Sequence, residues 1–204
     1  MGFYARHILP HILDLALRNK ESARLRADWI PQARGAVLEI GIGSGLNLPF
    51  YSSAVRRVYG VDPSSELQRM ARQRATGGIP VEFLLQSAEQ PLPLADASVD
   101  TVVVTWTLCS IPNPVAALQG MKRVLRPNGR LIFVEHGLSP DSSVMAWQKR
   151  ITPLWKQITG GCHLNRKIDR LIAETGFRIV ELKTGYTAGP RAMTYTYQGF
   201  AQIS

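Results

Sequence analysis

The sequence predicts a doubly wound α/β fold: a seven-stranded, mainly parallel sheet that ends in an antiparallel hairpin. Short apolar or β-branched runs alternate with helical segments, which is the order of parallel strands covered on both faces. Residues 100–105 read Asp-Thr-Val-Val-Val-Thr, a run typical of a strand buried on both faces. The last two strands are joined only by residues 184–192. Because this connection is too short for a helical crossover, the final strand should run antiparallel to its neighbour.

Local signals place the elements in order along the chain. Helices are expected at residues 8–19, 22–30, 64–76, 114–125, 144–158 and 166–175. Strands are expected at residues 35–40, 55–61, 81–86, 100–105, 130–135, 177–183 and 193–202. Pro10 stands near a helix start, where proline is tolerated, and Ser64 is a candidate N-cap. Pro153 should kink or split its helix, whereas Gly176 should end the helix before it.

Composition and charge indicate an ordinary globular protein with a basic surface. The 204 residues are 45% hydrophobic and 19% charged, which is enough for one full-sized core. The net charge of +9 favours anionic partners such as nucleic acid, an anionic membrane surface or an acidic substrate. The basic residues are spread over many helical segments and are not packed into one arm. A solvated basic surface is therefore the simpler interpretation, and nucleic-acid binding is not expected.

The sequence also bears on location and on cysteine chemistry. No apolar run approaches the roughly 18 residues of a membrane span, and Asp14 and Arg18 interrupt the apolar N-terminus in a way that does not fit a signal peptide. We expect a cytoplasmic protein, with peripheral contact at the inner membrane surface as the open alternative. Cys109 and Cys162 fit neither a zinc nor a disulfide framework, so both are expected to be free thiols and no metal site is predicted.

The first strand ends in the glycine-rich turn Gly41-Ile-Gly-Ser-Gly45, which the sequence predicts to bind a ligand. Glycines here let the backbone turn sharply and approach a ligand closely. Leu46 stands where the dinucleotide fingerprint Gly-x-Gly-x-x-Gly needs its third glycine, and no Gly-x-x-x-x-Gly-Lys-Ser/Thr is present. These departures count against NAD or FAD and exclude a P-loop, which leaves another ligand or a purely structural turn.

Two acids flank this turn. Glu39 lies two residues before Gly41, where a carboxylate repels a pyrophosphate but attracts the amino group of a methionine moiety, directly or through water. Asp62 ends the next strand, where an acid accepts hydrogen bonds from both hydroxyls of a ribose. Asp62 alone has a simpler interpretation as a helix N-terminal acid, but its combination with Glu39 and the glycines favours a cofactor that carries both groups.

Glu39 and the three glycines together resemble the Glu/Asp-x-Gly-x-Gly-x-Gly strand-turn of the class I S-adenosylmethionine-dependent methyltransferases. The resemblance covers about residues 35–130 and continues more loosely to the C-terminus. It implies a Rossmann-like methyltransferase fold that binds S-adenosyl-L-methionine and releases S-adenosyl-L-homocysteine. It also implies two parts within one structural domain: an N-terminal helical lid or extension at residues 1–34 and the methyltransferase domain at residues 35–204.

The resemblance assigns the cofactor-binding residues. They are Glu39, Gly41, Gly43, Gly45, Asn47, Asp62, Pro63, Ser87, Ala88 and Thr105. At the position of Ser87 the family commonly has an acid that holds the adenine amino group, and Ala88 would offer its backbone N–H to the adenine ring. Thr105 ends the fourth strand, where the family places groups beside the methionine sulfur.

Within the family, the back half of the chain looks like the microsomal thiol S-methyltransferases. The residues that carry this likeness are Leu108-Cys-Ser110, Glu135-His136, Trp147 and Trp155, and Gly161-Cys-His-Leu-Asn165. The bacterial phosphatidylethanolamine N-methyltransferases and the ubiquinone/menaquinone methyltransferases share only the front half. The implied function is methyl transfer to a small or lipophilic acceptor, with a thiol as one candidate. The alternative is N- or C-methylation of a membrane lipid such as phosphatidylethanolamine or of a quinone precursor.

His136 is the candidate catalytic residue. It follows the fifth strand, at the edge of the sheet where ligands bind, and histidine titrates near neutrality, so it could act as the base for a thiol acceptor. A capping or packing histidine is the simpler alternative. Cys162 with His163, and the tryptophans at 106, 147 and 155, could line the acceptor site or pack in the core. The first helix should pack as a lid over the cofactor or lie on an anionic membrane surface.

Overall fold

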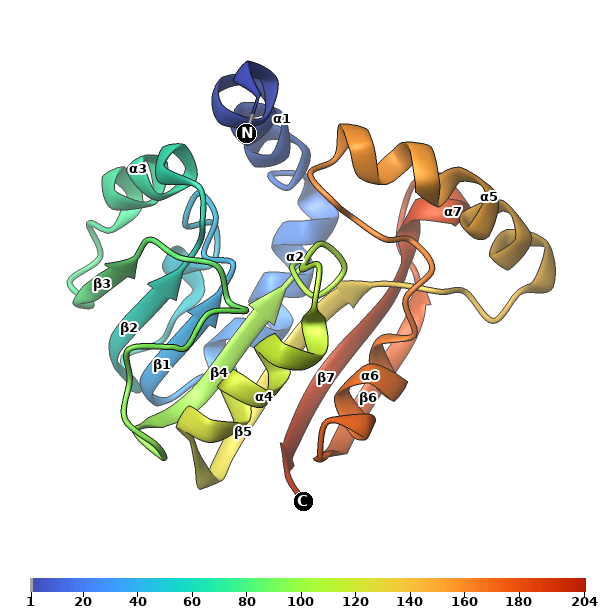
Figure 1. Cartoon of the computed structure of the whole chain (residues 1–204). Coiled ribbons are helices and arrows are strands. Elements are labelled where there is room, and N and C mark those ends of the chain that lie inside the picture. The colour runs from blue at the N-terminus through green and yellow to red at the C-terminus, as the bar shows by residue number, and fades with distance from the viewer. Residues whose placement is uncertain (1) are drawn as a thin grey trace.

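The computed structural model describes residues 2–204, and its sheet confirms the predicted fold class (Figure 1). Its strands are β1 (Gly35–Ile40), β2 (Val55–Val61), β3 (Val81–Leu84), β4 (Val99–Thr105), β5 (Leu125–His136), β6 (Phe177–Tyr186) and β7 (Tyr195–Ile203). Across the described residues the sheet has the order β3-β2-β1-β4-β5-β7-β6. Strands β1 to β5 pair in parallel, and β7 runs antiparallel to both β5 and β6, as the short connection predicted.

The helices follow the predicted order, with ends that differ by a few residues in either direction. They are the π-helix η1 (Tyr4–Ile8), α1 (Leu9–Ala16), α2 (Lys20–Trp29), α3 (Ser65–Arg74), α4 (Pro114–Val124), α5 (Ser142–Ile158), α6 (Ile168–Glu174) and α7 (Arg191–Thr194), with 3-10 turns η2 (Ile30–Gln32) and η3 (Leu48–Phe50). Pro10 lies in the first turn of α1, and the Ser64 hydroxyl caps α3 by accepting the N–H of Leu67. The N-terminal helix ends earlier than expected because Asn19 starts α2 as its cap.

Two element ends differ from the expectation. Of the kink or split expected at Pro153, the split does not occur: helix α5 continues from Ser142 to Ile158, because a proline removes one backbone hydrogen bond and the rest of the ladder holds the helix together. Strand β5 begins at Leu125, five residues before the predicted start, since the Arg126-Pro-Asn-Gly129 turn is drawn into the strand through a register shift opposite Val99.

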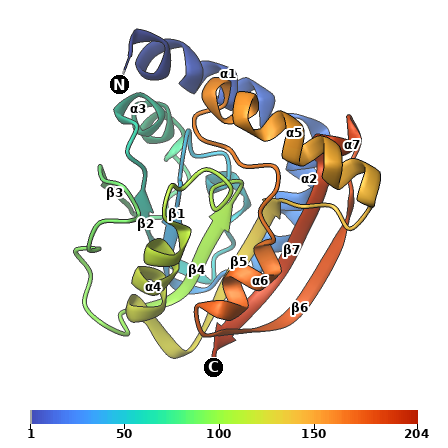
Figure 2. The same cartoon turned by 45° about the vertical axis from the view of Figure 1, so that its right-hand side comes forward.

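Hydrophobic side chains cover both faces of the sheet. On one face, the apolar residues of α4 and α6 pack against Val102 and Val104 of β4. On the other face, Leu25 and Trp29 of α2 pack against Val103 and neighbouring strands. Alternate residues of one strand thus enter opposite cores, which is the arrangement that the β-branched run predicted. Figure 2 shows α4 and α6 on the face opposite α2.

The parallel strands all end at one edge of the sheet, and this edge carries the predicted site. In Figure 1 the arrowheads of β1, β2, β4 and β5 point to the same edge, and α1 and α5 lie over it. Ligands of open α/β sheets bind outside this carboxyl edge. Among the helices of residues 2–204, none combines the length and the hydrophobicity that crossing a bilayer would require.

Candidate functional site

The glycine turn after β1 has the backbone geometry that its sequence predicted. Gly41, Gly43 and Gly45 have φ angles of +70°, +53° and +79°, a region that favours glycine. A Cβ on Gly41 would lie 2.1 Å from Oγ1 of Thr107. A Cβ on Gly43 would instead meet nothing closer than 3.8 Å. The turn is therefore packed tightly on the protein at Gly41 and open at Gly43, so a bound group can approach the backbone there.

Asp62 directly follows β2 and holds Gly43 in place through a hydrogen bond to its backbone. Its Oδ2 accepts the N–H of Gly43 at 3.0 Å, and its Oδ1 accepts the N–H of Ser64 at 2.8 Å. Burial raises the pKa of Asp62 to about 6. Each carboxylate oxygen can accept more than one hydrogen bond. Asp62 therefore has capacity left for two hydroxyl donors, which suits a ribose at this turn.

Glu39, Asn47 and Thr105 were predicted as separate cofactor-binding residues, and the structure joins them in one network. The Asn47 amide nitrogen donates to Glu39 at 2.9 Å and to Thr105 Oγ1 at 3.0 Å. The other Glu39 oxygen accepts the Tyr51 hydroxyl at 2.7 Å. Nε of Arg26 in α2 donates to the side-chain oxygen Oδ1 of Asn47 at 3.0 Å. Both oxygens of Glu39 thus hold protein groups, and Asn47 links β1, β4 and α2.

Burial dominates the electrostatics of this network. Glu39 is completely buried, and this burial raises its pKa to about 7, although the hydrogen bonds from Tyr51 and Asn47 and the charge of Arg26 oppose the rise. Burial also lowers the pKa of Arg26 to about 10. A bound ammonium or sulfonium group would favour the ionised form of Glu39. The buried network around the Glu39 carboxylate therefore matches a cationic methionine moiety better than an anionic pyrophosphate.

The predicted adenine-binding residues lie after β3. Ser87 is half-buried and its hydroxyl donates to Glu89 at 3.1 Å, while Ala88 is buried and Pro63 is exposed. Glu89 also accepts the N–H of Asn113 at 2.7 Å through its other oxygen. The family commonly has an acid at the Ser87 position. Here the nearest acid is Glu89, two residues further on, which the sequence reasoning passed over although it stands in the same motif.

A second group of side chains meets at the ends of β4 and β5. Cys162 Sγ lies 3.1 Å from Nε2 of His136, and the ligand atoms of Cys109, His136 and Cys162 all lie within 4.8 Å of one another. Both cysteines are buried free thiols. The sequence analysis named the segments of all three residues in one resemblance but did not predict that their side chains meet. Cys109 and His136 follow neighbouring parallel strands, which was a usable signal, whereas Cys162 comes from the distant segment after α5.

The remaining candidates separate into different environments. Trp155 packs against Cys109, Cys162 and Leu164, so it lines this sulfur-rich cluster. The half-buried Trp106 lies under Arg26, whose Cζ is 4.7 Å from the ring centroid. Trp147 is 61% exposed on α5 and lines neither group. His163 does not join the cluster, but its N–H donates to the Cys109 carbonyl at 2.8 Å.

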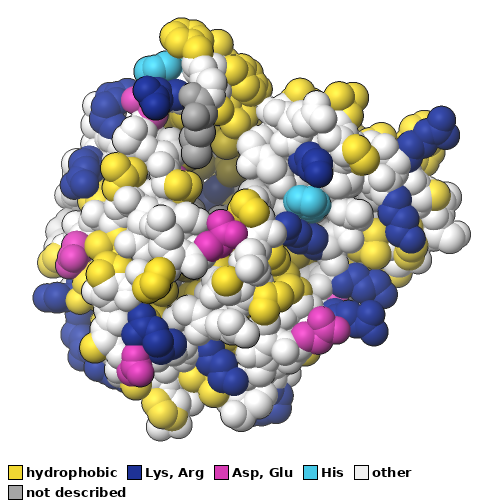
Figure 3. Space-filling model, viewed as in Figure 1, with side chains coloured by type: hydrophobic (Ala, Val, Ile, Leu, Met, Phe, Trp, Pro, Cys, Tyr) yellow, Lys and Arg dark blue, Asp and Glu magenta, His cyan; other side chains and the backbone are white. Residues whose placement is uncertain are grey.

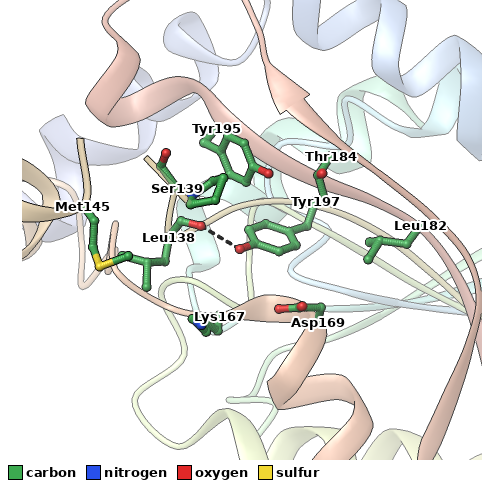
Figure 4. Close-up of a pocket in the computed structure, with 10 residues that line it drawn as sticks. Leu138, Ser139, Met145, Lys167, Asp169, Leu182, Thr184, Tyr195 and Tyr197 are labelled. Carbon is green, nitrogen blue, oxygen red and sulfur yellow. Dashed lines mark hydrogen bonds between the residues drawn. The ribbon is translucent and has the colours of Figure 1, made fainter. Parts of the chain in front are cut away.

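A cavity of about 290 Å³ lies away from these residues, beside β6 and β7. Figure 4 shows Tyr195 and Tyr197 among its walls, with the Tyr197 hydroxyl donating to the Leu138 carbonyl oxygen at 2.6 Å. None of the predicted cofactor-binding residues lines it.

Figure 3 shows Lys and Arg side chains scattered over the viewed face, without a continuous stripe that would follow a nucleic-acid backbone.

Comparisons with known proteins agree with this geometry. Residues 38–133 match the model of the family described as "Methyltransferase domain". A thiol S-methyltransferase of Rattus norvegicus is 36% identical over 151 residues, which are 72% of this chain and 62% of that protein. A phosphatidylethanolamine N-methyltransferase of Cereibacter sphaeroides is 34% identical over 164 residues, 79% of either chain. The chain thus spans less than two thirds of the length of the thiol S-methyltransferase.

Solved structures agree on the fold. A SAM-dependent methyltransferase of Thermotoga maritima superposes with a TM-score of 0.67 at 21% identity, covering 98% of this chain and 99% of the other. The open space at Gly43, the acceptor capacity of Asp62 and the buried carboxylate of Glu39 are compatible with the S-adenosylmethionine cofactor of such proteins. On its fold, its glycine turn and its sequence similarity, the chain belongs to the S-adenosylmethionine-dependent methyltransferase family.

Proposed function

We propose that this chain transfers a methyl group from S-adenosylmethionine to the sulfur of a small or lipophilic thiol. The observation that carries the acceptor class is the meeting of Cys109, His136 and Cys162 at the carboxyl ends of β4 and β5. Sulfur and imidazole groups at this edge give a place where a thiol can be held and deprotonated. The similarity to a thiol S-methyltransferase supports the same acceptor class.

The cofactor, when bound, supplies a methyl group attached to a sulfonium sulfur. The acceptor attacks the methyl carbon in line with that sulfur, and the sulfur is the leaving group. The chain's own contribution is to hold the reactants in line and to exclude water. Asp62 would accept the ribose hydroxyls, while Asn47 and Thr105 would fix the methionine end through the network anchored on Glu39. The Ser87 and Ala88 segment would face the adenine. These residue roles rest on the position of each group around the glycine turn.

The acceptor thiol must lose its proton, because the thiolate is the reactive form. His136 is the candidate base, and its Nδ1 is buried without a hydrogen-bond partner among residues 2–204. The assignment stays a prediction: in His136→Ala, the rate with a thiol acceptor should fall and its dependence on pH near neutrality should flatten. An unchanged pH–rate profile would remove His136 from this role.

A second acceptor class is a membrane lipid amine such as phosphatidylethanolamine, or a quinone precursor. The specific observation in its favour is a group of exposed apolar side chains at the carboxyl edge of the sheet. They are Phe3, Tyr4, Ile8, Ile12 and Leu15 in the N-terminal helices and Trp147, Leu154 and Ile158 in α5. Similarity to a phosphatidylethanolamine N-methyltransferase over 79% of the chain points the same way.

Methyl transfer from labelled S-adenosylmethionine to a panel of acceptors tests the proposal. The panel contains small and lipophilic thiols, phosphatidylethanolamine in vesicles and quinols. The expected result is labelled thioether from at least one lipophilic thiol, with Asp62→Ala abolishing it. Labelling of phosphatidylethanolamine or a quinol with no thiol product would replace the thiol proposal by the second class. Labelling of none of these acceptors would contradict both.

A further inference from the structure

The loop after β4 is held rigidly, and this fixes Cys109. The Glu135 carboxylate accepts the N–H groups of Thr107 at 2.7 Å, Leu108 at 2.9 Å and Cys109 at 3.3 Å. Arg166 donates to the carbonyl oxygens of Leu108 and Ile111 from the other side of the loop. A side chain on such a loop is positioned by its backbone before any ligand arrives.

Cys162 is brought to the same place by a separate segment. Gly161 has a φ of +99°, and a Cβ there would lie 3.0 Å from the Ser110 carbonyl oxygen, so glycine allows the close approach of the two loops. His136 ends β5 between the two loops, with Nε2 toward Cys162. Three different elements thus direct two sulfurs and one nitrogen at a common point.

The spacing of these atoms suits a four-coordinate metal. In a tetrahedral zinc site, with Zn–S near 2.3 Å and Zn–N near 2.0 Å, ligand atoms lie about 3.5 Å from one another. Here the three ligand atoms lie within 4.8 Å of one another, and Cys162 Sγ is 3.1 Å from His136 Nε2. Small side-chain movements would therefore bring the three atoms to three of the four ligand positions of a tetrahedral metal site. Two thiolates would also neutralise a divalent cation, which lowers the cost of burying charge.

The surroundings suit thiolate ligands. The indole N–H of Trp155 is buried without a nitrogen or oxygen partner among the described residues, and Trp155 packs against the two cysteines. A thiolate sulfur is a group to which such an N–H can donate. Ile151 and Met193 add partly buried apolar side chains around the cluster.

We propose that Cys109, His136 and Cys162 bind one Zn²⁺ ion, whose fourth position takes the sulfur of the acceptor. Both cysteines are buried, whereas His136 is half-buried. Three protein ligands with one open position are the pattern of a catalytic zinc, in contrast to the closed four-ligand pattern of a structural one. The glycine turn is close, because Gly41 packs directly on Thr107, two residues before Cys109.

This inference rests on the thiol acceptor of the proposed function and deepens it by one change: His136 binds the ion and is no longer the base itself. On binding the ion, the acceptor thiol releases its proton to solvent and becomes a metal-bound thiolate. The sulfur then forms a bond to the methyl carbon as the bond from that carbon to the sulfonium sulfur breaks. The electron pair of the broken bond stays on the departing sulfur, and the neutral thioether product leaves the ion. The metal, in place of the His136 imidazole, thus makes the acceptor reactive.

Metal content of the full chain gives the first test. Protein purified under reducing conditions without chelator is supplied with Zn²⁺, desalted and analysed by mass spectrometry of the metal. About one zinc per chain is expected, with loss in Cys109→Ser and in Cys162→Ser. His163→Ala is the matched control, because His163 is the neighbour of Cys162 but lies outside the cluster, and it should keep the ion. Substoichiometric zinc in the unaltered chain, or unchanged zinc in both serine variants, would overturn the proposal.

Two further measurements do not depend on how the serine variants fold. Bound zinc should protect both thiols of the unaltered chain from alkylation, and bound Co²⁺ should give thiolate charge-transfer bands and the visible bands of tetrahedral geometry. Alkylation at the same rate with and without zinc would contradict the site.

A control on the serine variants separates loss of metal from loss of fold. Titration with S-adenosylhomocysteine should show that these variants keep their cofactor affinity.

The activity of the metal-loaded chain separates this inference from the function on which it rests. Removal of zinc should lower kcat for a thiol acceptor while leaving cofactor affinity unchanged. Thiol methylation at full rate without zinc would overturn the metal's role and leave the proposed function standing. Stoichiometric zinc on these ligands with no thiol methylated would support the metal site and contradict the proposed thiol acceptor.

Discussion

The carboxylate of Asp14 in α1 accepts a hydrogen bond from the Ser44 hydroxyl in the glycine turn, at 2.5 Å. Asp14 is only 7% exposed, and it also pairs with Arg74 of α3 at 2.9 Å and with Arg18. Arg74 in turn donates to the backbone carbonyl of Ser44. The N-terminal helix is therefore joined to the glycine turn by a charged contact, centred on the buried Asp14, that links α1, α3 and the turn.

Removing this carboxylate should loosen the glycine turn. Asp14→Ala leaves Arg74 without its buried partner and Ser44 without its acceptor, so we expect a loss of about 2 kcal/mol in the free energy of unfolding. Cofactor affinity should fall as well. The control is Asp28→Ala in α2, where the exposed pair with Arg24 at 3.3 Å should contribute less than about 1 kcal/mol. Urea unfolding and titration with S-adenosylhomocysteine measure both quantities; equal effects of the two substitutions would contradict the argument.

Asp62 should be needed for cofactor binding. It orders Gly43 through its N–H and has acceptor capacity left for the ribose, and hydrogen bonds to a charged group contribute about 1.5–3 kcal/mol each. Asp62→Ala should therefore weaken S-adenosylmethionine binding at least about tenfold in calorimetry. Asp96→Ala, at an exposed acid that pairs with Arg123, is the control and should bind normally. Retained affinity in Asp62→Ala would remove the ribose assignment.

Much of the fold was predictable because its signals are local. The β-branched run of β4, the glycine turn and the short last connection each determine a neighbourhood of the sheet by sterics or chain length alone. The ends of elements were less predictable. Pro153 was expected to kink or split α5, but the remaining hydrogen bonds keep one helix from Ser142 to Ile158.

The site was predictable where its residues are adjacent in sequence to strand ends. Glu39 and Asp62 were selected as candidates in this way, and their cofactor-binding roles stay predictions, whereas the contacts that organise them were not predicted. The Asp14 to Ser44 contact and the approach of Cys162 to His136 depend on how distant helices dock on the sheet, which no local pattern encodes. The division into an extension at residues 1–34 and a domain at residues 35–204 stays a prediction. The buried Trp29 and Ile30 pack within the second core, so that segment contributes to the fold itself.

Stability of the cofactor-free chain should fall as the pH rises through neutrality. Burial raises the pKa of Asp62 from 3.8 to about 6 and that of Glu39 from 4.5 to about 7. Since each folded-state pKa lies above the unfolded value, the folded state holds these protons more tightly. The resulting stabilisation is fully present below the unfolded pKa values and is lost as the pH rises past 6 and 7. Carboxylates with lowered pKa, such as Asp14, act in the opposite direction but at lower pH.

Urea unfolding between about pH 5 and pH 8 measures this effect. In Glu39→Gln the decline near pH 7 should be smaller, because the amide cannot ionise but keeps the shape and one acceptor oxygen for Tyr51. In Asp96→Ala, at an exposed position, the pH dependence should be unchanged. A stability that rises over this range, or an equal decline in Glu39→Gln, would contradict the assignment of the buried carboxylates.

The exposed apolar side chains of η1, α1 and α5 should bind an anionic membrane surface. The two helical segments are joined where the Tyr4 hydroxyl donates to the Ile158 carbonyl at 2.9 Å, so their apolar residues share one region of the surface. Basic residues of the same helices are Arg6, Lys149, Arg150 and Lys156. Burial of apolar side chains together with attraction of these cations predicts binding to anionic vesicles that weakens with added salt.

Paired serine substitutions test this surface better than a truncation, because deleting residues 1–30 would also remove the core residue Trp29. Ile12 and Leu15 are 47% and 74% exposed, so Ile12→Ser with Leu15→Ser should leave the free energy of unfolding nearly unchanged and reduce vesicle sedimentation several-fold. Val180→Ser is the matched control, since Val180 is a comparably exposed apolar residue on β6. If both variants sediment with anionic vesicles as the unaltered chain does, the apolar residues of α1 do not contact the bilayer, and the helix acts at the cofactor turn through Asp14 alone.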